Sequence, residues 1–259
     1  DLADIRHSFH RFAELLPAHG LLVMNGDIKN IDEITDGVDA DLVTYKVSGE
    51  ADYTASDITY DRQGCASFTL VHKGTPVGPV ELHVPGIHNV SNALAALATT
   101  MELGFDFKTA SEGLAMFHGT DRRFQYKGKL GDITVIDDYA HHPDEIRATI
   151  KTAKHYPHKK MWVVFQPHTY TRTKALLPEF CKALSEADAV VLADIYAARE
   201  KDTLGISSKD VMKGIKKLGT EAYYFPSFSE IENFLLENCS TGDLLITMGA
   251  GDVVKIGEH

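Results

Sequence analysis

The sequence of 259 residues has few cysteines, no excess of basic residues and no long apolar run. Its three cysteines lie far apart without a CxxC pair, which argues against a disulfide framework and favours reduced thiols. Lysine and arginine number 26 against 37 acidic residues, and a net charge of -11 argues against a nucleic-acid partner. No tract of about 18 apolar residues could cross a bilayer, so no membrane partner is expected.

The sequence also lacks a phosphate-binding loop of the form GxxxxGK[ST]. An ATP enzyme of the class that uses this loop would be incomplete in these residues. The first residues contain no initiator Met, and their apolar side chains have helical spacing from the start. We therefore expect the chain to be part of a longer one.

The length and an ordinary share of 44 % hydrophobic residues predict a globular protein of two domains. Residues 21–118 indicate a strand, several antiparallel strands, an Ala- and Leu-rich helix that stops at Gly104, and a second helix. We place the domain boundary near residue 120, which divides the chain into residues 1–119 and 120–259.

After residue 120, the apolar runs ITVI, MWVVF, AVVLADI and LLITM alternate with helical stretches near 143–154, 172–186, 207–217 and 228–237. This alternation is typical of an α/β protein with a doubly wound, mostly parallel sheet. Ligands bind beyond the carboxyl ends of such strands. Polar groups that follow the runs should therefore converge: Asp137, Asp138, Tyr139, His141, His142, Gln166, His168, Asp194, Tyr196 and the glycines of GAGD, residues 249–252.

The stretch DDYAHHPDEI, residues 137–146, allows two interpretations. Asp137 and Asp138 could cap the helix that begins near Pro143. Alternatively, one carboxylate accepts ribose hydroxyls or binds a metal, while Tyr139 or His141 approaches a second substrate. The spacing does not identify a zinc site.

Three other stretches carry candidate binding groups. FQPHTYTRTK, residues 165–174, is either a solvated basic loop or a place where Arg172 holds a carboxylate with its fork. GTDRRF offers two arginines that are either simply exposed or stabilise phosphate charge. HNVSN places Asn89 and Asn92 on one helical face, for capping or for contact with adenine. GAGD favours a tight turn into the last helix.

Seven segments, taken in order, resemble the Mur ligase family and within it the alanine-adding members. They are GIHNVSNALAALA, GTDRRFQ, DDYAHHPDEI, VFQPHTYTRT, DIYAAREKD, GISS and ITMGAGDVVKIGE. The resemblance implies part of a central α/β ATPase domain followed by a whole Rossmann-like C-terminal domain. It also implies that the UDP-sugar domain, the phosphate loop and most magnesium ligands precede residue 1 in the family.

The resemblance implies a cytoplasmic, ATP- and magnesium-dependent ligase that joins L-alanine to UDP-N-acetylmuramate through an acyl phosphate. Asn89 and Asn92 would face adenine, and Asp138 would face the ribose. Arg123 would contact the γ-phosphate and is a catalytic candidate together with His141 and His168. The substrate-binding group implied around alanine and the acyl phosphate consists of Tyr139, His141, His168 and Arg172. No metal ligand is assigned, and we expect the chain alone to be inactive.

Two alternatives remain open at this point. A murein tripeptide-recycling ligase typically has EPRSNT in place of FQPHTYTRT and Phe in place of Tyr139, and this sequence follows the alanine-adding pattern at both places. A stand-alone nucleotide-binding module without catalysis would keep the same site. One departure from the family is Thr169, which stands where an arginine is common and removes a positive charge.

Overall fold

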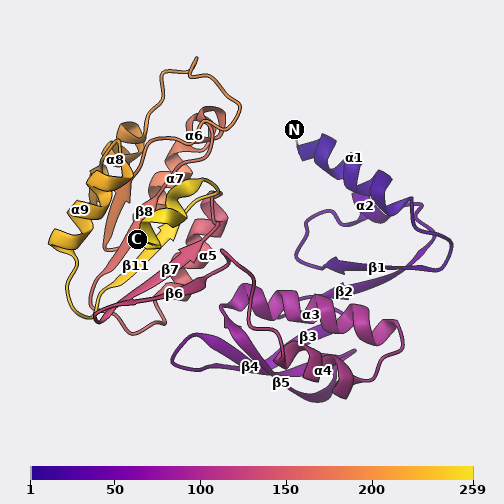
Figure 1. The fold of residues 1–259 in the computed structure, drawn as a ribbon. Helices are drawn as coiled ribbons and strands as arrows, with labels where there is room; N and C mark the ends of the chain where they lie inside the picture. The colour runs from indigo at the N-terminus through magenta and orange to yellow at the C-terminus, as the bar shows by residue number, and fades with distance from the viewer. Residues whose placement is uncertain (1, 259) are drawn as a thin grey trace. The chain divides into compact units, whose positions relative to one another are not determined.

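Two separate β-sheets organise the chain, and each belongs to a different unit (Figure 1). The computed structural model describes residues 2–258. The N-terminal unit comprises residues 1–118, and the C-terminal unit comprises residues 119–259. Each unit has its own buried core.

The sheet of the N-terminal unit has five strands in the order β1-β2-β3-β4-β5. Strands β1 to β3 run parallel, and β3, β4 and β5 pair antiparallel as the alternating sequence predicted. The strands are β1 Gly20–Asn25, β2 Ala40–Tyr45, β3 Tyr53–Tyr60, β4 Cys65–His72 and β5 Thr75–Pro85.

Helix α3 (Ile87–Glu102) covers this sheet with an apolar face. Val90, Leu94 and Leu97 are almost completely buried, and burial stabilises each by about 1.5–3 kcal/mol. The helix ends as predicted before Gly104, whose φ of 92° suits a residue after a helix end. The other helices of this unit are α1 Leu2–Ala13, α2 Asp32–Thr35 and α4 Phe107–Ala115.

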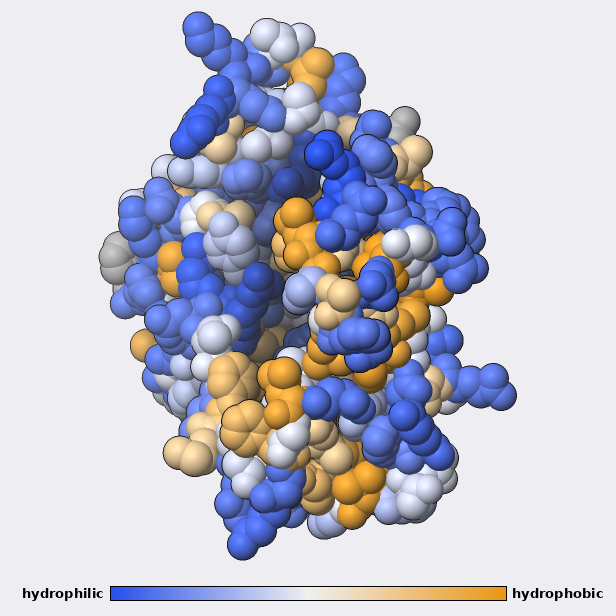
Figure 2. All heavy atoms as spheres, turned by 90° about the vertical axis from the view of Figure 1, so that its right-hand side faces the viewer, coloured by the Kyte–Doolittle hydropathy of each residue, from blue (hydrophilic) through white to orange (hydrophobic). Residues whose placement is uncertain are grey.

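Helix α1 presents apolar side chains to solvent. Phe9 is 57 % exposed and Phe12 is 69 % exposed, and an Arg6–Glu33 ion pair at 2.8 Å joins the helix to α2. The space-filling view in Figure 2 shows apolar side chains among the polar ones at the surface. Among the described residues, no helix is long and apolar enough to cross a membrane.

The C-terminal unit contains the doubly wound, mostly parallel sheet that the sequence predicted. Its strand order is β10-β9-β8-β11-β7-β6, and only the β6–β7 pair is antiparallel. The strands are β6 Gln125–Leu130, β7 Ile133–Asp138, β8 Met161–Phe165, β9 Ala189–Leu192, β10 Glu221–Tyr224 and β11 Leu244–Met248.

Helices lie on both faces of this sheet. One apolar cluster packs α5, α7 and α8 against the sheet, and the other includes residues of α9 and the 3₁₀ helix η1. The bounds are α5 Pro143–Ala153, α6 Tyr170–Ala175, α7 Leu177–Leu184, α8 Ser208–Lys217, α9 Phe228–Asn238 and η1 Asp252–Gly257.

The single helix predicted near residues 172–186 is wrong, because the chain forms two helices that meet at Leu176. Pro178 follows this junction in the first turn of α7. Proline lacks a backbone N–H and its ring clashes with the carbonyl four residues earlier, so a helix breaks before it. The short helix α6 therefore ends at Ala175, before the proline of α7.

The parallel register brings the carboxyl ends of four strands level. Met248 of β11 pairs with Asp138 of β7 and with Phe165 of β8, which in turn pairs with Leu192 of β9. The residues that follow these four positions consequently emerge at one edge of the sheet.

Candidate active site

A row of four aromatic rings lies at the carboxyl edge of the C-terminal sheet. Ring centroids are 5.3 Å apart for Tyr139 and His141, 5.7 Å for His141 and His168, and 5.7 Å for His168 and Tyr196. These residues follow β7, β8 and β9, so the predicted convergence of Tyr139, His141 and His168 is observed. Tyr196 completes the row, and its position after β9 was the only sequence signal for it.

His168 lies against Arg172, which belongs to the first turn of α6. The Arg172 Nη1 atom is 3.5 Å from His168 Nδ1, and both side chains are half-buried. Burial lowers the pKa of His168, and the charges of Arg172 and His141 lower it further. His168 is therefore predominantly neutral near pH 7, and because arginine can only donate, its Nδ1 is the acceptor and its Nε2 carries the proton.

Thr169 shapes the backbone between these two side chains. Its φ is 63°, a conformation that β-branched residues rarely adopt, and its hydroxyl accepts a hydrogen bond from Arg172 N at 3.4 Å. Its backbone N–H donates to Tyr196 O at 2.9 Å. The residue that departs from the family pattern thus caps α6 and joins the loops after β8 and β9.

Asp138 is 7 % exposed, and both of its carboxylate oxygens accept backbone hydrogen bonds. The donors are Phe124 N at 3.0 Å and Ala140 N at 2.8 Å. Burial raises the pKa of Asp138 to about 6, although these hydrogen bonds act in the opposite direction. The carboxylate is thus held rigidly, and only a small part of it remains accessible.

The interpretation of Asp137 and Asp138 as helix caps is wrong. The N-cap of α5 is His142, whose Nδ1 accepts from Asp144 N at 3.3 Å. Glu145 completes this capping box by accepting from His142 N at 3.1 Å. Neither aspartate caps α5, and the carboxylates of both accept hydrogen bonds from other groups of the site.

Arg123 is exposed beside the ring row. Its guanidinium carbon lies 5.6 Å from the ring centroid of Tyr139. Within residues 2–258 the Arg123 guanidinium forms no close ion pair, although its charge opposes the effect of burial and lowers the pKa of Asp138 and of Glu145. Its positive charge is available to an anion.

The glycines of residues 249–251 pack closely on Gln166. A Cβ at Gly251 would meet Gln166 Oε1 at 2.4 Å, and a Cβ at Gly249 would meet Gln166 O at 2.8 Å. The predicted tight turn is present, with a φ of 145° at Gly249, and η1 follows it. Buried Gln166 Oε1 has no hydrogen-bond partner among the described residues.

Asn89 and Asn92 belong to the N-terminal unit. Their amides share one face of α3, where Asn92 Nδ2 donates to Asn89 Oδ1 at 3.1 Å and Asn89 Nδ2 donates to Pro85 O at 2.8 Å. The N-cap of α3 is Gly86, and no side chain caps the helix. Capping therefore does not account for either asparagine.

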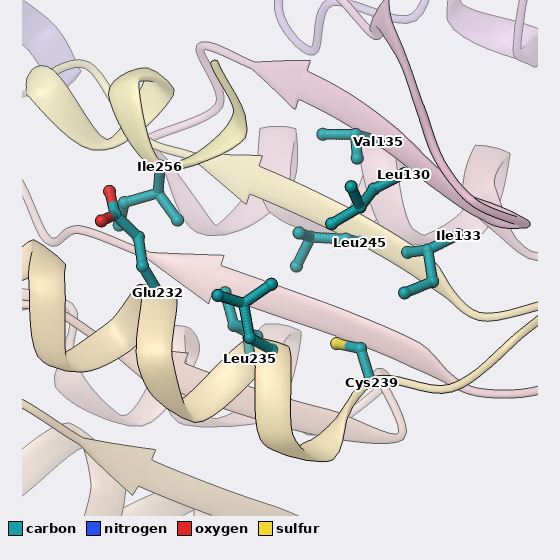
Figure 3. Close-up of a pocket in the computed structure, with 9 residues that line it drawn as sticks. Leu130, Ile133, Val135, Glu232, Leu235, Cys239, Leu245 and Ile256 are labelled. Carbon is teal, nitrogen blue, oxygen red and sulfur yellow. The ribbon is translucent and has the colours of Figure 1, made fainter. Parts of the chain in front are cut away.

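The described residues contain a cavity away from this edge of the sheet but no group of side chains that could hold a metal ion. No group of three or more His, Cys, Asp or Glu side chains in residues 2–258 could hold a metal ion. An apolar cavity of about 280 Å³ in the C-terminal unit is lined by side chains of the sheet, of α9 with the following Cys239, and of η1 (Figure 3). None of the candidate residues lines it.

Comparison with known proteins identifies the class. The family model "Mur ligase, glutamate ligase domain" matches residues 122–251, and the "Mur ligase middle domain" model matches residues 1–100. The chain belongs to the Mur ligase family.

Individual relatives narrow the comparison. A UDP-N-acetylmuramate–L-alanine ligase of Agathobacter rectalis is 55 % identical over 258 residues, which cover 100 % of this chain and 56 % of the relative. The crystal structure of a UDP-N-acetylmuramate–alanine ligase from Thermotoga maritima matches with a TM-score of 0.80 and 30 % identity, over 100 % of this chain and 54 % of that one. The chain thus spans little more than half the length of these relatives.

A murein peptide ligase from Psychrobacter arcticus shares the fold. Its structure matches with a TM-score of 0.70 and 24 % identity, over 99 % of this chain and 54 % of that chain. At this identity the likeness concerns the fold alone.

Proposed function

We propose that this chain carries the nucleotide- and amino-acid-handling residues of a cytoplasmic ligase that joins L-alanine to UDP-N-acetylmuramate in peptidoglycan precursor synthesis. The observation that carries the proposal is the convergence of Arg123, Tyr139, His141, His168 and Arg172 at one sheet edge. The names of the relatives support the choice of substrates.

The proposed reaction needs ATP because a carboxylate is a poor electrophile. The muramate carboxylate attacks the γ-phosphorus, ADP leaves, and the alanine amine then displaces phosphate from the acyl phosphate. Exposed Arg123 would stabilise the charge on the transferred phosphoryl group. Asn89 and Asn92 would contact adenine through their amides, and the accessible part of Asp138 would accept from a ribose hydroxyl.

The amino-acid end of the site has complementary groups. Arg172 can bind both oxygens of the alanine carboxylate with its fork. Neutral His168 accepts from that guanidinium through Nδ1 at 3.5 Å, so its Nε2–H can donate a hydrogen bond to the alanine carboxylate or the acyl phosphate. Tyr139 and His141 extend the ring row towards Arg123 and would position the two reacting groups beside one another.

Magnesium is implied by the family, but the described residues do not fit a metal site of their own. When bound, the ion would neutralise phosphate charge. None of the roles given above depends on it.

The proposal is tested by measuring phosphate release from ATP with UDP-N-acetylmuramate and L-alanine. We expect no activity from this chain alone and activity from the same chain extended to the length of its relatives. A muramyl tripeptide used in preference to L-alanine would instead indicate the recycling ligase. ATP binding by the extended chain without any turnover would indicate a nucleotide-binding module.

The amino-acid site is tested in the extended chain by Arg172→Ala. Loss of a bidentate carboxylate partner costs about 1.5–3 kcal/mol, so the KM for alanine should rise by one to two orders of magnitude. Arg147→Ala is a matched control, because Arg147 is also a half-buried arginine and its ion pairs are with Asp144 and Glu186. An unchanged KM for alanine in Arg172→Ala would reject the assignment.

A further inference from the structure

Arg122, the neighbour of Arg123, joins three segments at the site edge. Its Nε donates to Asp137 Oδ2 at 3.1 Å, and its Nη2 donates to Gly249 O at 2.6 Å. The Asp137 side chain is fully buried, and its other oxygen accepts from Thr247 Oγ1 at 2.6 Å. The guanidinium of Arg122 is thereby committed to protein groups from β7 and from the loop after β11.

The two adjacent aspartates hold the residues on either side of Arg123. Asp137 binds the Arg122 side chain, and Asp138 accepts a hydrogen bond from Phe124 N at 3.0 Å. Phe124 is also buried in the core. Arg122 and Phe124 have φ values of 60° and 48°, which persist in non-glycine residues only when tertiary contacts impose them.

Tyr139 links the two arginines. Its backbone N–H donates to Arg122 O at 2.6 Å, and the Arg122 guanidinium carbon lies 4.9 Å from its ring centroid. The exposed Arg123 guanidinium lies against the same ring at 5.6 Å. Arg122 thus fixes the aromatic surface on which Arg123 rests.

We propose that Arg122 and Asp137 are positioning residues that present Arg123 to the phosphate of the substrate. This inference rests on the proposed function, in which Arg123 meets the γ-phosphate. Nε and Nη2 of Arg122 are bound to protein groups, so we assign the phosphate contact to the exposed Arg123. Of the two adjacent arginines, Arg122 holds the loop and Arg123 meets the phosphate. Of the two adjacent aspartates, Asp137 binds Arg122 and Asp138 binds Phe124 N.

The simpler explanation is that the Arg122–Asp137 ion pair only stabilises the fold. This explanation does not account for the fixed backbone around Arg123. A buried ion pair contributes little net stability, because desolvation offsets the attraction between its charges. What the pair adds is one fixed arrangement of the loop around Arg123. That arrangement would matter most where an anion must be met at a defined distance.

The test uses this chain and three substitutions. Arg122→Lys keeps the charge but cannot reach Asp137 and Gly249 O together, and Asp137→Asn removes the charge that anchors Arg122. Arg147→Lys is the matched control, because its ion pair with Asp144 involves neither Asp137 nor Gly249. The first readout is the NMR signal of Arg123 Hε, which the Tyr139 ring shifts. The second readout is binding of ATP compared with binding of adenosine.

We expect Arg122→Lys and Asp137→Asn to lose the ring-induced shift of Arg123 Hε, and Arg147→Lys to keep it. Affinity for ATP should fall roughly two- to fivefold, as expected for a lost cation–π contact at an exposed site, while affinity for adenosine stays the same. A general structural defect would instead weaken both ligands equally. An unchanged Arg123 signal, or equal losses for ATP and adenosine, would overturn the proposal.

A fourth substitution covers the case in which both Arg122→Lys and Asp137→Asn prevent folding. Tyr139→Leu leaves the Arg122–Asp137 pair intact but removes the ring, and it should alter the Arg123 signal and ATP affinity in the same direction. No change in this variant would also overturn the proposal. Failure of ATP to perturb Arg123 in the unsubstituted chain would count against the phosphate role of Arg123, whereas the shift of Arg123 Hε tests its positioning without any ligand.

Discussion

At the scale of single residues, Asp138 should titrate far above an ordinary aspartate. Burial raises its pKa to about 6, and the carboxyl carbon signal in NMR should show a midpoint near that pH. Asp210 is the internal control, because a hydrogen bond from Ser207 lowers its pKa. A midpoint for Asp138 below that of Asp210 would contradict the prediction.

The same carboxyl group links stability to pH. Because the folded pKa exceeds the unfolded value of 3.8, the folded state holds the proton more tightly between about pH 4 and 6. The contribution of Asp138 to the free energy of unfolding therefore decreases across this window by up to about 3 kcal/mol and is constant above it. Urea unfolding at pH 4.5 and 7 measures the free energy of unfolding of the unsubstituted chain and of Asp138→Asn. Between pH 4.5 and 7 the unsubstituted chain should lose more stability than the asparagine variant.

Residue roles were only partly predictable from the sequence. The convergence of Tyr139, His141 and His168 follows from apolar runs, because parallel strands end at a common edge. Arg122 and Arg123 look alike in the sequence, and only the packing of Gly249, 127 positions away from Arg122, separates them. Long-range contacts of this kind leave no local signal.

At the scale of elements, two glycines in helices should respond in opposite ways to alanine. A Cβ at Gly214 in α8 would meet Cys181 Sγ at 2.2 Å, whereas a Cβ at Gly113 in α4 meets nothing within 4 Å. Gly214→Ala should reduce the free energy of unfolding by about 1–3 kcal/mol through overpacking. Gly113→Ala should be neutral or stabilise by up to about 1 kcal/mol. Urea unfolding followed by circular dichroism measures both, and equal effects would reject the packing argument.

Helix starts and ends were predictable only where their chemistry is unambiguous. Gly104 ends α3 as expected, because a positive φ after a helix strongly favours glycine. The start of α5 at Pro143 agrees with the helix predicted near 143–154, but its cap was not predicted, since aspartate is a common cap and His142 is not. The two aspartates that looked like caps were already needed by Arg122 and by Phe124 N.

At the scale of the whole molecule, the apolar face of α1 should bind hydrophobic dyes. Phe9 and Phe12 are more than half exposed, and contiguous apolar surface is uncommon on globular proteins. The double change Phe9→Ser and Phe12→Ser should reduce fluorescence of a bound naphthalene sulfonate dye by roughly half or more. Phe105→Ser is the control, because Phe105 is 56 % exposed but lies outside α1. Equal reductions in both variants would show that α1 is not special.

The fold class of the C-terminal unit was the most predictable property of the molecule. Buried strands such as Met161–Phe165 are apolar throughout and alternate with helices, which is the pattern of a parallel sheet. The order of the strands was not predictable, because β11 could have joined an edge. Strand register and strand order depend on tertiary packing, which the sequence of a single strand does not determine.

The central place of β11 has a consequence for how the protein is made. Residues 244–248 form the strand between β7 and β8, yet they are synthesised after both of them. While the ribosome still holds this segment, the nascent sheet consists of two separated halves, and the loops that carry Tyr139 and His168 have no common support. Ribosome-bound chains stalled before residue 244 should therefore resist protease poorly, and the site can assemble only after residues 244–248 have left the ribosome.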